Sequence, residues 1–279
     1  MKLFRRLIII VLIGTVSILF GVSALAEEPC LTVYFLDVGQ ADSAIIICDD
    51  KVLMIDGGNA ADSQFIYSML RNTLDIQTID YMIASHPHED HVGGLAAALN
   101  ACFVGVLYTP ETDYPSKAWN NVLKYAEAQG TPVVIPMPGD AFEAGSAKVD
   151  ILGPMWFSNN TNNMSLIVRI TYGNVTFLFT GDAEREEEQD LVEADVPLQA
   201  DVLKVSHHGS NSSSGDVFLG AVKPRYAVVS VGADNQYGHP AEEVLGRLID
   251  AGAEIYRTDL QGTIICKTNG TYVEFRTEK

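Results

Sequence analysis

The stretch His86-Pro87-His88-Glu89-Asp90-His91 decides how this sequence is interpreted. It holds three of the six histidines of the 279-residue chain, follows a short apolar run at 81–84 and precedes Gly93-Gly94. Loops that follow strands are where α/β scaffolds place their sites. Imidazole nitrogens and carboxylate oxygens suit zinc and related divalent ions. We therefore expect a metal site here and not a polar surface loop.

The spacing within this stretch predicts two neighbouring metal positions. His86 and His88 are two residues apart on extended chain, so their side chains point to one side. Asp90 and His91 lie where the chain turns into a helix, so they can face a second point nearby. The following glycines allow a sharp turn of the backbone there.

The rest of the chain alternates apolar and helical patterns without a linker. Strands are predicted at 31–36, 44–48, 52–55, 81–84, 104–108, 133–135, 149–152, 166–172, 175–180, 202–205, 226–231, 254–257, 263–267 and 272–275, and helices at 63–71, 94–100, 116–129, 184–192 and 242–251. Two successive runs each begin with strands and pass into strand-helix alternation. This order predicts one α/β (α+β) domain over 27–279, a four-layer αββα sandwich of two similar halves.

The N-terminus has the features of a signal peptide. Lys2, Arg5 and Arg6 precede an apolar run at 7–20, and Ala24-Leu25-Ala26 offers the small residues of a cleavage site. Residues 1–26 are predicted to be removed, which leaves no stable membrane insertion. The alternative is an uncleaved anchor, since 7–26 is about long enough to span a bilayer. Both interpretations place the remaining chain outside the cytoplasm, either secreted or anchored.

The four cysteines, Cys30, Cys48, Cys102 and Cys266, form no CxxC pair, which argues against a zinc-thiolate site. Export permits disulfides in any of three connectivities. Cys48 and Cys266 fall in apolar runs, where burial as free thiols is the simpler interpretation.

The chain is strongly acidic. Lys and Arg number 18 and Asp and Glu number 36, so the net charge is −18. Such a balance argues against a basic surface that binds duplex nucleic acid. The acidic run at 184–188 is interpreted as a solvated helix face and not as a calcium site.

Several motifs resemble one family. His86-x-His88-x-Asp90-His91 is the signature of the metallo-β-lactamase fold superfamily, and the resemblance covers nearly all of 27–279. Further motifs are similar to the soluble hydrolase domain of ComEC-type competence proteins: Leu36-Asp37-Val38-Gly39-Gln40, Asp56-Gly57-Gly58, Thr180-Gly181-Asp182, Lys204-Val205-Ser206-His207-His208-Gly209-Ser210 and Tyr237-Gly238-His239-Pro240.

The resemblance implies roles for individual residues. One metal site would comprise Asp90, His91, Asp182 and His239, and the other His86, His88 and Asp182, with Asp56 orienting a ligand histidine. Members of the superfamily usually add a third histidine to the site of His86 and His88, and this chain has Asn162-Asn163-Met164-Ser165 in that region. Either His207 or Asn163 completes that site, or the site is weaker.

His207 and His208 follow a predicted strand. Adjacent side chains on extended chain face opposite ways, so we expect one imidazole to point towards the metals and the other away. We assign the inward position to His207, as a ligand or as a general acid for the leaving group. His208 would then lie behind the ligands or pack against the backbone.

These residues predict a metal-dependent hydrolase. Two ions lower the pKa of a bridging water, which Asp90 or Asp182 would orient. Zinc is the default from the ligand types, and manganese also accepts them. The resemblance implies phosphodiesterase or nuclease-type chemistry on nucleic acid or on a cell-wall or small-molecule ester, and the acidic surface favours the latter. The alternatives are an amide or ester hydrolase of the β-lactam-cleaving kind, which usually has the third histidine, and a noncatalytic metal-binding protein.

Overall fold

The computed structural model describes residues 30–111 and 113–279, so the predicted signal peptide lies outside the described residues. The described chain forms two sheets. The order in the first is β15 (Val273–Thr277), β14 (Ile264–Thr268), β1 (Leu31–Phe35), β2 (Ser43–Cys48), β3 (Lys51–Gly57), β4 (Thr78–Ile83), β5 (Phe103–Tyr108) and β6 (Val133–Val134). The order in the second is β13 (Glu254–Arg257), β12 (Tyr226–Val229), β11 (Val202–Lys204), β10 (Val175–Phe179), β9 (Ile167–Tyr172), β8 (Ala147–Gly153) and β7 (Ala141–Ala144).

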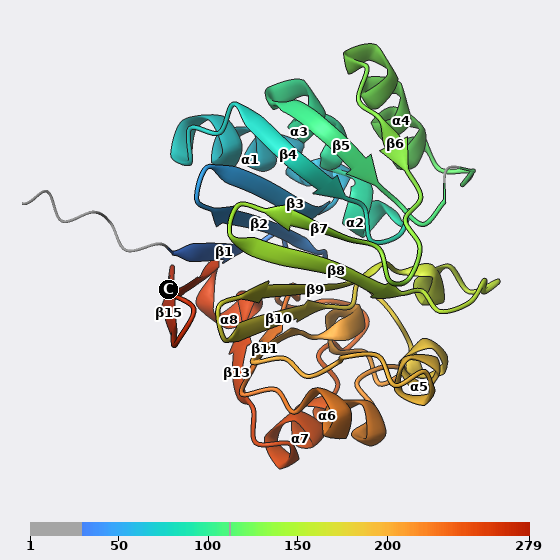
Figure 1. Ribbon diagram of the computed structural model, residues 1–279, viewed down its shortest axis with the longest axis vertical. Helices are drawn as coiled ribbons and strands as arrows, with labels where there is room; N and C mark the ends of the chain where they lie inside the picture. The colour runs from blue at the N-terminus through green and yellow to red at the C-terminus, as the bar shows by residue number, and fades with distance from the viewer. Residues whose placement is uncertain (1–29, 112) are drawn as a thin grey trace, which may run out of the picture.

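Helices cover the outer face of each sheet, and the two sheets lie face to face between them (Figure 1). The first sheet carries α1 (Ser63–Ser68), α3 (Leu95–Ala101) and α4 (Lys117–Gln129), whereas the second carries α5 (Arg185–Glu193), α6 (Asp216–Val222) and α7 (Glu242–Asp250). Short helices α2 (Glu89–Val92) and α8 (Thr258–Gln261) lie in connections. The predicted αββα sandwich is confirmed.

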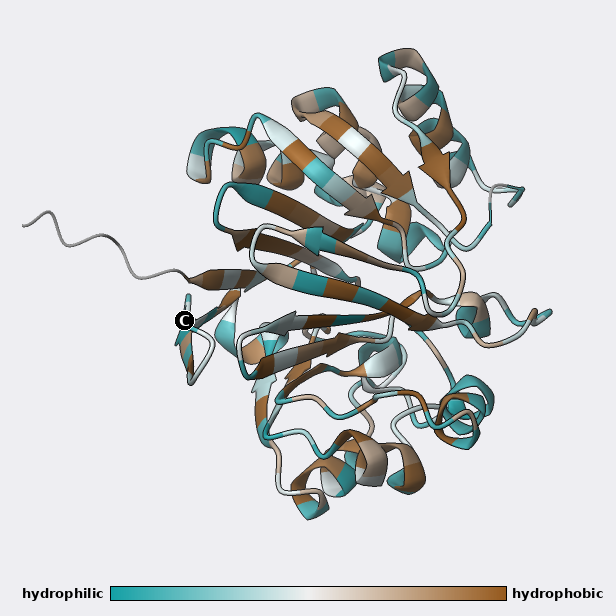
Figure 2. Ribbon diagram, viewed as in Figure 1, coloured by the Kyte–Doolittle hydropathy of each residue, from teal (hydrophilic) through white to brown (hydrophobic). Residues whose placement is uncertain are grey.

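Three apolar cores fill the spaces between these four layers. Phe35 and Phe177 belong to the core between the sheets, Met54 and Trp119 to the core under the helices of the first sheet, and Leu203 to the core under those of the second. Figure 2 shows the central strands as mostly hydrophobic. This burial of strands on both faces explains why they occur as continuous apolar runs in the sequence.

Strand β10 shows how one run serves two cores. Phe177 and Phe179 pack between the sheets, and Leu178 between them in sequence packs under the outer helices. The period of two along a strand produces this alternation. The carboxyl end of the strand is thereby fixed on both faces, which positions the residues that follow it.

The two sheets repeat one arrangement. Strands β3 to β6 pair in parallel in the first sheet, and β10 to β13 do so in the second. The two halves are not independent, because β14 and β15 return from the second half to pair beside β1. The loop after β4 meets the residue before β9 where the Leu166 N–H donates to the Ser85 carbonyl (2.8 Å).

Some elements differ from the sequence predictions. Strand β7 and helix α6 were not predicted. All four cysteines are free thiols, Cys30 exposed and the other three buried, and Cys48 and Cys266 lie in the core between the sheets as expected. In the described ranges, no helix combines the length and the apolar character needed to cross a bilayer.

Candidate metal centre

Loops after three parallel strands supply the centre. The chain leaves β4 through Ser85 to His88 and enters α2, which carries Asp90 and His91. Asp182 follows β10, and the short turn Ser206–Gly209 follows β11. Strands β10 and β11 are parallel neighbours in the second sheet, so their carboxyl ends lie at one edge, and the loop after β4 of the first sheet meets them there. Three groups of side chains there could hold a metal ion: Asp90, His91, Asp182 and His208; His86, His88 and Asp182; and Asp42, Asp56 and His91.

The group of His86, His88 and Asp182 is compact. His86 Nε2 lies 3.0 Å from His88 Nδ1 and 3.8 Å from Asp182 Oδ2. Two nitrogen ligands on a tetrahedral zinc ion are ~3.4 Å apart, given a bond of about 2.0–2.1 Å. The spacing therefore suits a shared ion.

The group of Asp90, His91, Asp182 and His208 lies on the other side of Asp182. His91 Nε2 is 3.1 Å from Asp182 Oδ1, and His208 Nε2 is 3.4 Å from Asp90 Oδ2 and 3.8 Å from Asp182 Oδ1. Asp182 thus directs Oδ2 to one group and Oδ1 to the other, which is the geometry of a carboxylate between two ions.

The polar atoms at the centre fit a cation. Asp182 Oδ1, His91 Nε2 and His208 Nε2 are buried and have no hydrogen-bond partner in the described chain. Leaving one such atom unpaired in a protein interior costs about 1–3 kcal/mol. Asp42, Asp56 and Asp182 are all buried, and among the described residues Lys204 is the one lysine or arginine ion-paired with any of them. Buried carboxylates need compensating positive charge, which metal ions would provide.

Carboxylates behind the imidazoles turn them towards the centre. Asp56 Oδ2 lies 2.9 Å from His91 Nδ1, and Ser85 donates to Asp56 through its N–H (2.8 Å) and its hydroxyl (2.7 Å). This places Asp56 where the resemblance implied. His208 Nδ1 lies 3.0 Å from the Ser230 carbonyl and 3.2 Å from Asp42 Oδ1. Both Nε2 atoms consequently face the centre, as in metal sites where a carboxylate orients a histidine ligand.

Lys204 and Asp42 form a buried pair behind His208. Lys204 Nζ lies 2.7 Å from Asp42 Oδ2 and donates to the Val205 carbonyl (2.9 Å). Neither residue was predicted to have a role. The available signal was that Lys204 opens one motif of the resemblance and that Asp42 lies two residues after another.

The electrostatic environment favours anionic carboxylates at Asp90 and Asp182 and an unprotonated imidazole at His86. Burial lowers the pKa of His86 well below 6.5, which favours the unprotonated imidazole that binds metals. Burial alone would raise the pKa of Asp90, but His208 and His91 lower it to about 2. Burial opposes ionisation of Asp182 as well, yet the surrounding histidines hold its pKa well below 3.8.

His239 lies outside the three groups. Its Nδ1 is 3.4 Å from Gln40 Nε2, and its ring contacts the rings of His207 (5.8 Å between centroids) and Tyr237 (5.7 Å). The place that we expected for His239 beside Asp90 and His91 is taken by His208.

Both histidines of the His207-His208 pair approach Asp182, so the expectation that one points away is wrong. His207 Nε2 lies 3.6 Å from Asp182 Oδ2, beside the approach of His208 to Oδ1. The reason is the backbone, because His207 (φ 49°) and His208 (φ 52°) both adopt the left-handed conformation. The rule that neighbours face opposite ways holds only for extended chain.

Asn163 does not face the histidines. Its Nδ2 donates to Glu186 Oε2 (3.1 Å), and its Oδ1 accepts from the Glu184 N–H (2.9 Å). Ser165 reaches the centre instead, where its hydroxyl lies 3.4 Å from His86 Nδ1 and accepts from the Asp182 N–H (3.0 Å). A serine in a polar loop carries no distinctive pattern, so the sequence alone gave no signal for it.

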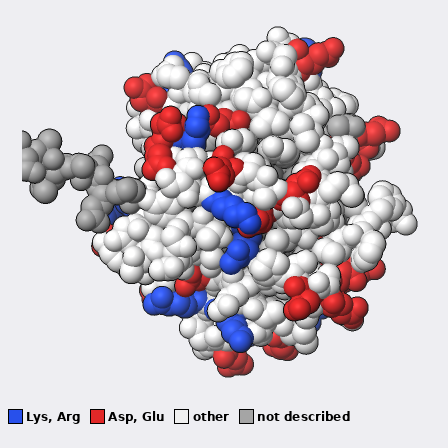
Figure 3. Space-filling view, in the orientation of Figure 1, with Lys and Arg blue, Asp and Glu red and all other residues white. Residues whose placement is uncertain are grey.

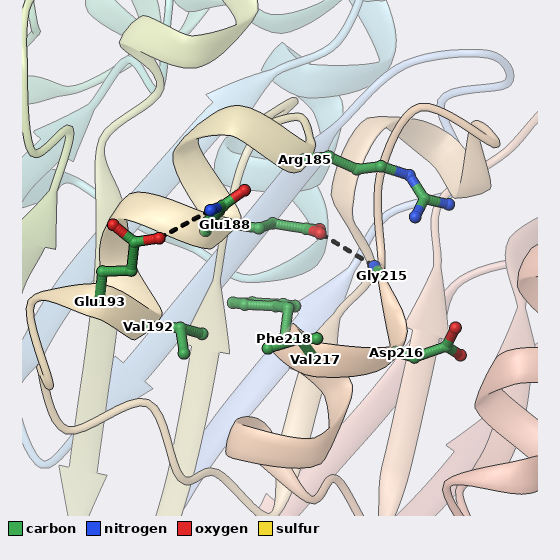
Figure 4. A pocket seen from close by; sticks show the side chains of 9 residues that line it. Arg185, Glu188, Val192, Glu193, Gly215, Asp216, Val217 and Phe218 are labelled. Carbon is green, nitrogen blue, oxygen red and sulfur yellow. Dashed lines mark hydrogen bonds between the residues drawn. The ribbon is translucent and has the colours of Figure 1, made fainter.

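The acidic run at 184–188 is only in part a solvated face, because Glu186 is exposed and two of its neighbours are not. Glu187 and Glu188 are buried, at 2% and 3% exposure. Glu187 Oε1 accepts from the Met155 N–H (2.8 Å), and Glu188 Oε2 accepts from the Gly215 N–H (2.9 Å) (Figure 4). A pocket of about 410 Å³ lies between α5 and α6, and none of the centre's residues lines it (Figure 4). Helix α5 therefore holds the loops at Met155 and Gly215 in place through these hydrogen bonds.

Sequence comparison relates the chain to competence proteins. The chain is 30% identical over 258 residues to ComE operon protein 3 of Bacillus subtilis (strain 168), which covers 85% of this chain and 33% of that protein. It is 30% identical over 240 residues to competence protein ComA of Neisseria gonorrhoeae, covering 85% of this chain and 32% of that protein. The chain thus spans about a third of the length of these curated relatives.

Comparison with solved structures supports the same fold. The metallo-beta-lactamase fold protein YhfI from Bacillus subtilis matches with a TM-score of 0.58 at 14% identity, over 86% of this chain and 100% of that one. CmlA, a diiron beta-hydroxylase from Streptomyces venezuelae, matches with a TM-score of 0.53 at 16% identity, over 82% of this chain and 53% of that one. The family model described as "Metallo-beta-lactamase superfamily" matches residues 36–233. The chain therefore belongs to the metallo-beta-lactamase superfamily, whose members are typically metal-dependent hydrolases.

Proposed function

We propose that this hydrolase cleaves phosphodiesters outside the cytoplasm with the help of two divalent metal ions. The observation that carries the proposal is the position of Asp182, whose two oxygens face two separate sets of ligand atoms. Paired ions suit displacement at phosphorus, where both the attacking and the leaving oxygen need stabilisation. The export part of the proposal rests on the N-terminal sequence, with its basic residues and apolar run.

The chain's residues divide into holding and orienting groups. His86, His88 and Asp182 would hold one ion, and Asp90, His91, His208 and Asp182 the other. This assignment puts His208 where we had expected His239. When bound, the ions supply a water of lowered pKa and a Lewis acid for the phosphoryl oxygen.

His207 is a partly exposed side chain that can act on the substrate. Its ring is 23% exposed, whereas those of His86, His91 and His208 are buried. A half-buried imidazole beside the centre can bind a metal ion or donate a proton to the leaving group. No serine or cysteine nucleophile is required for this chemistry.

The charge of the molecule restricts the substrate. The net charge is −18, and Figure 3 shows Asp and Glu side chains gathered at several places around one face, with fewer Lys and Arg. A phosphate backbone binds through many basic contacts, which this surface does not favour. We propose a small or cell-wall phosphodiester in preference to duplex nucleic acid.

Hydrolysis of bis(p-nitrophenyl) phosphate by the purified protein tests the proposal. Zinc, manganese and a chelated control would be compared, beside Asp182→Asn and the exposed Asp50→Asn as a matched control. We expect metal-dependent turnover that falls at least a hundredfold in Asp182→Asn and is unchanged in Asp50→Asn. Absence of turnover from a protein that binds two ions would refute the phosphodiesterase proposal and direct the search to lactams, amides and esters.

A further inference from the structure

Glu184 occupies a junction beside the centre that the proposed chemistry does not use. It lies two residues after Asp182, at the N-cap of α5, and its side chain is 25% exposed. Its carboxylate has four polar neighbours: His207 Nδ1 (3.3 Å), Ser212 Oγ (3.1 Å) and Asn162 Nδ2 (3.2 Å) at Oε1, and Asn160 Nδ2 (2.9 Å) at Oε2.

These neighbours come from both loops that border the centre. Asn160 and Asn162 precede Ser165, whose hydroxyl touches His86. Ser212 follows the turn that carries His207 and His208. One carboxylate therefore links the loop before β9, which reaches His86 through Ser165, with the turn after β11.

His207 depends on this junction for its orientation. Its backbone is left-handed (φ 49°), so neither a strand nor a helix fixes the direction of the ring. Nδ1 faces Glu184 Oε1 (3.3 Å) and Ser212 Oγ (3.3 Å), and the opposite nitrogen, Nε2, faces Asp182 Oδ2 (3.6 Å). Ser212 itself donates to Glu184, so both contacts at Nδ1 lead to one carboxylate.

We propose that Glu184 is a positioning residue that holds the His207 ring with Nε2 directed at Asp182. The proposal rests on the proposed function for its catalytic consequence. A carboxylate that fixes one nitrogen of an imidazole selects which nitrogen faces the reaction, and loss of such a partner typically lowers activity about 10–100-fold. Glu184 would act through His207 and not by contact with the substrate.

A double-mutant cycle separates this role from general support of the loops. Glu184→Gln removes the anionic acceptor, and His207→Ala removes the ring. Glu193→Gln is the matched control, because Glu193 on the same helix accepts only from Gln189 in the described chain (2.6 Å). We expect Glu184→Gln to lower kcat about tenfold with little change in KM, and Glu193→Gln to leave both unchanged.

The cycle is decided in the His207→Ala background. If Glu184 acts through His207, adding Glu184→Gln there changes kcat less than about twofold, because interacting residues are not additive. If the two losses multiply, the carboxylate works through the loops or the ions and the proposal is wrong. Thermal unfolding of each variant identifies losses that come from unfolding.

A second readout does not need turnover. Long-range ¹H–¹⁵N spectra of the imidazoles, assigned with His207→Ala, report the ring nitrogens directly. We expect the His207 resonances to shift in Glu184→Gln and to stay in place in Glu193→Gln. Unshifted His207 resonances in Glu184→Gln would overturn the proposal, whereas failure of the wild type to hydrolyse any diester would refute only the proposed function.

Discussion

The direction of each imidazole nitrogen determines what the centre can bind. His91 and His208 both turn Nδ1 to a carboxylate, Asp56 and Asp42 respectively, and both turn Nε2 inwards. His91 lies after a strand of the first sheet and His208 after a strand of the second, yet a carboxylate lies beside Nδ1 of each ring. Such support fixes the tautomer and orientation of a metal ligand before the metal arrives.

Substitution of the two late histidines distinguishes the geometry from the sequence prediction. His208→Gln is expected to lower metal affinity about 10–100-fold, because Nε2 faces Asp90 and Asp182. His239→Gln is expected to keep both ions, because its ring contacts Gln40 and Tyr237 instead. Metal content per chain after dialysis measures both. Loss of one ion in His239→Gln, with two retained in His208→Gln, would reverse the assignment.

Single residues also show what sequence can and cannot predict. The spacing from His86 to His91 already implied two neighbouring groups, and the structure brings those side chains together with Asp182. The choice between His208 and His239 required the backbone, because left-handed conformations such as those at His207 and His208 are uncommon in residues other than glycine and no local pattern predicted them. Contacts such as Lys204 with Asp42 join residues 162 positions apart, which no local pattern encodes.

At the scale of elements, two glycines fix α2 and α3 against the end of β3. A Cβ on Gly94 would lie 2.1 Å from the Gly57 carbonyl oxygen, and one on Gly93 would lie 2.2 Å from the Ala60 nitrogen. The chain can therefore pass from His91 into α3 only where no side chain intervenes. The sequence predicted that these glycines allow a sharp turn. The structure shows that glycine is required here mainly because neighbouring backbone atoms leave no room for a Cβ.

Gly94→Ala tests this contact. The added methyl group overlaps backbone that has no room to move, so the free energy of unfolding should fall by about 1–3 kcal/mol or more. Gly246→Ala in the interior of α7 is the control, since a Cβ there has no neighbour within 4 Å. That substitution should raise stability by up to about 1 kcal/mol. Urea unfolding of both variants gives the comparison, and equal stabilities would contradict the close contact.

Helix α5 is an element whose role could not be predicted from its composition. Four glutamates in five residues indicated a solvated face, yet Glu187 and Glu188 are buried because they accept hydrogen bonds from loop N–H groups. Burial raises the pKa of Glu187 to about 7. Two acidic side chains of the helix are therefore buried, and their hydrogen bonds hold two loops in place.

The raised pKa of Glu187 makes stability depend on pH. Unfolded glutamate titrates near 4.5, so between pH 4.5 and 7 the folded chain binds more protons than the unfolded chain. Unfolding free energy from this group therefore falls as pH rises through that window. Glu187→Gln keeps an acceptor for Met155 and should raise Tm at pH 8 by about 2–4 °C relative to wild type, with no gain at pH 4.5. A gain of the same size at both pH values would contradict the titration.

At the scale of the whole molecule, the four layers place the centre at the edge where the loops after β4, β10 and β11 of the two sheets meet. The layers themselves were predictable, because apolar runs, helix spacing and turn residues all agreed. The return of β14 and β15 to β1 was not, since pairing between the two ends of the chain depends on the assembled sheet.

The charge of the whole molecule predicts an unusual salt dependence. Proteins that bind DNA through basic contacts lose affinity steeply as salt rises. With a net charge of −18, this chain should cleave duplex DNA poorly, with a rate that stays flat or rises between 50 and 200 mM salt. Rates on the small diester should be nearly constant. A steep fall on DNA over this range would show a basic binding surface and contradict the preference for small esters.

The number of divalent ions bound per chain tests the central claim most directly. Native mass spectrometry of the protein titrated with zinc would give it without reference to any substrate. Two groups joined by Asp182 predict two ions in the wild type and at most one in Asp182→Asn. A wild-type chain that binds no ion, or an Asp182→Asn chain that still binds two with unchanged affinity, would contradict the account.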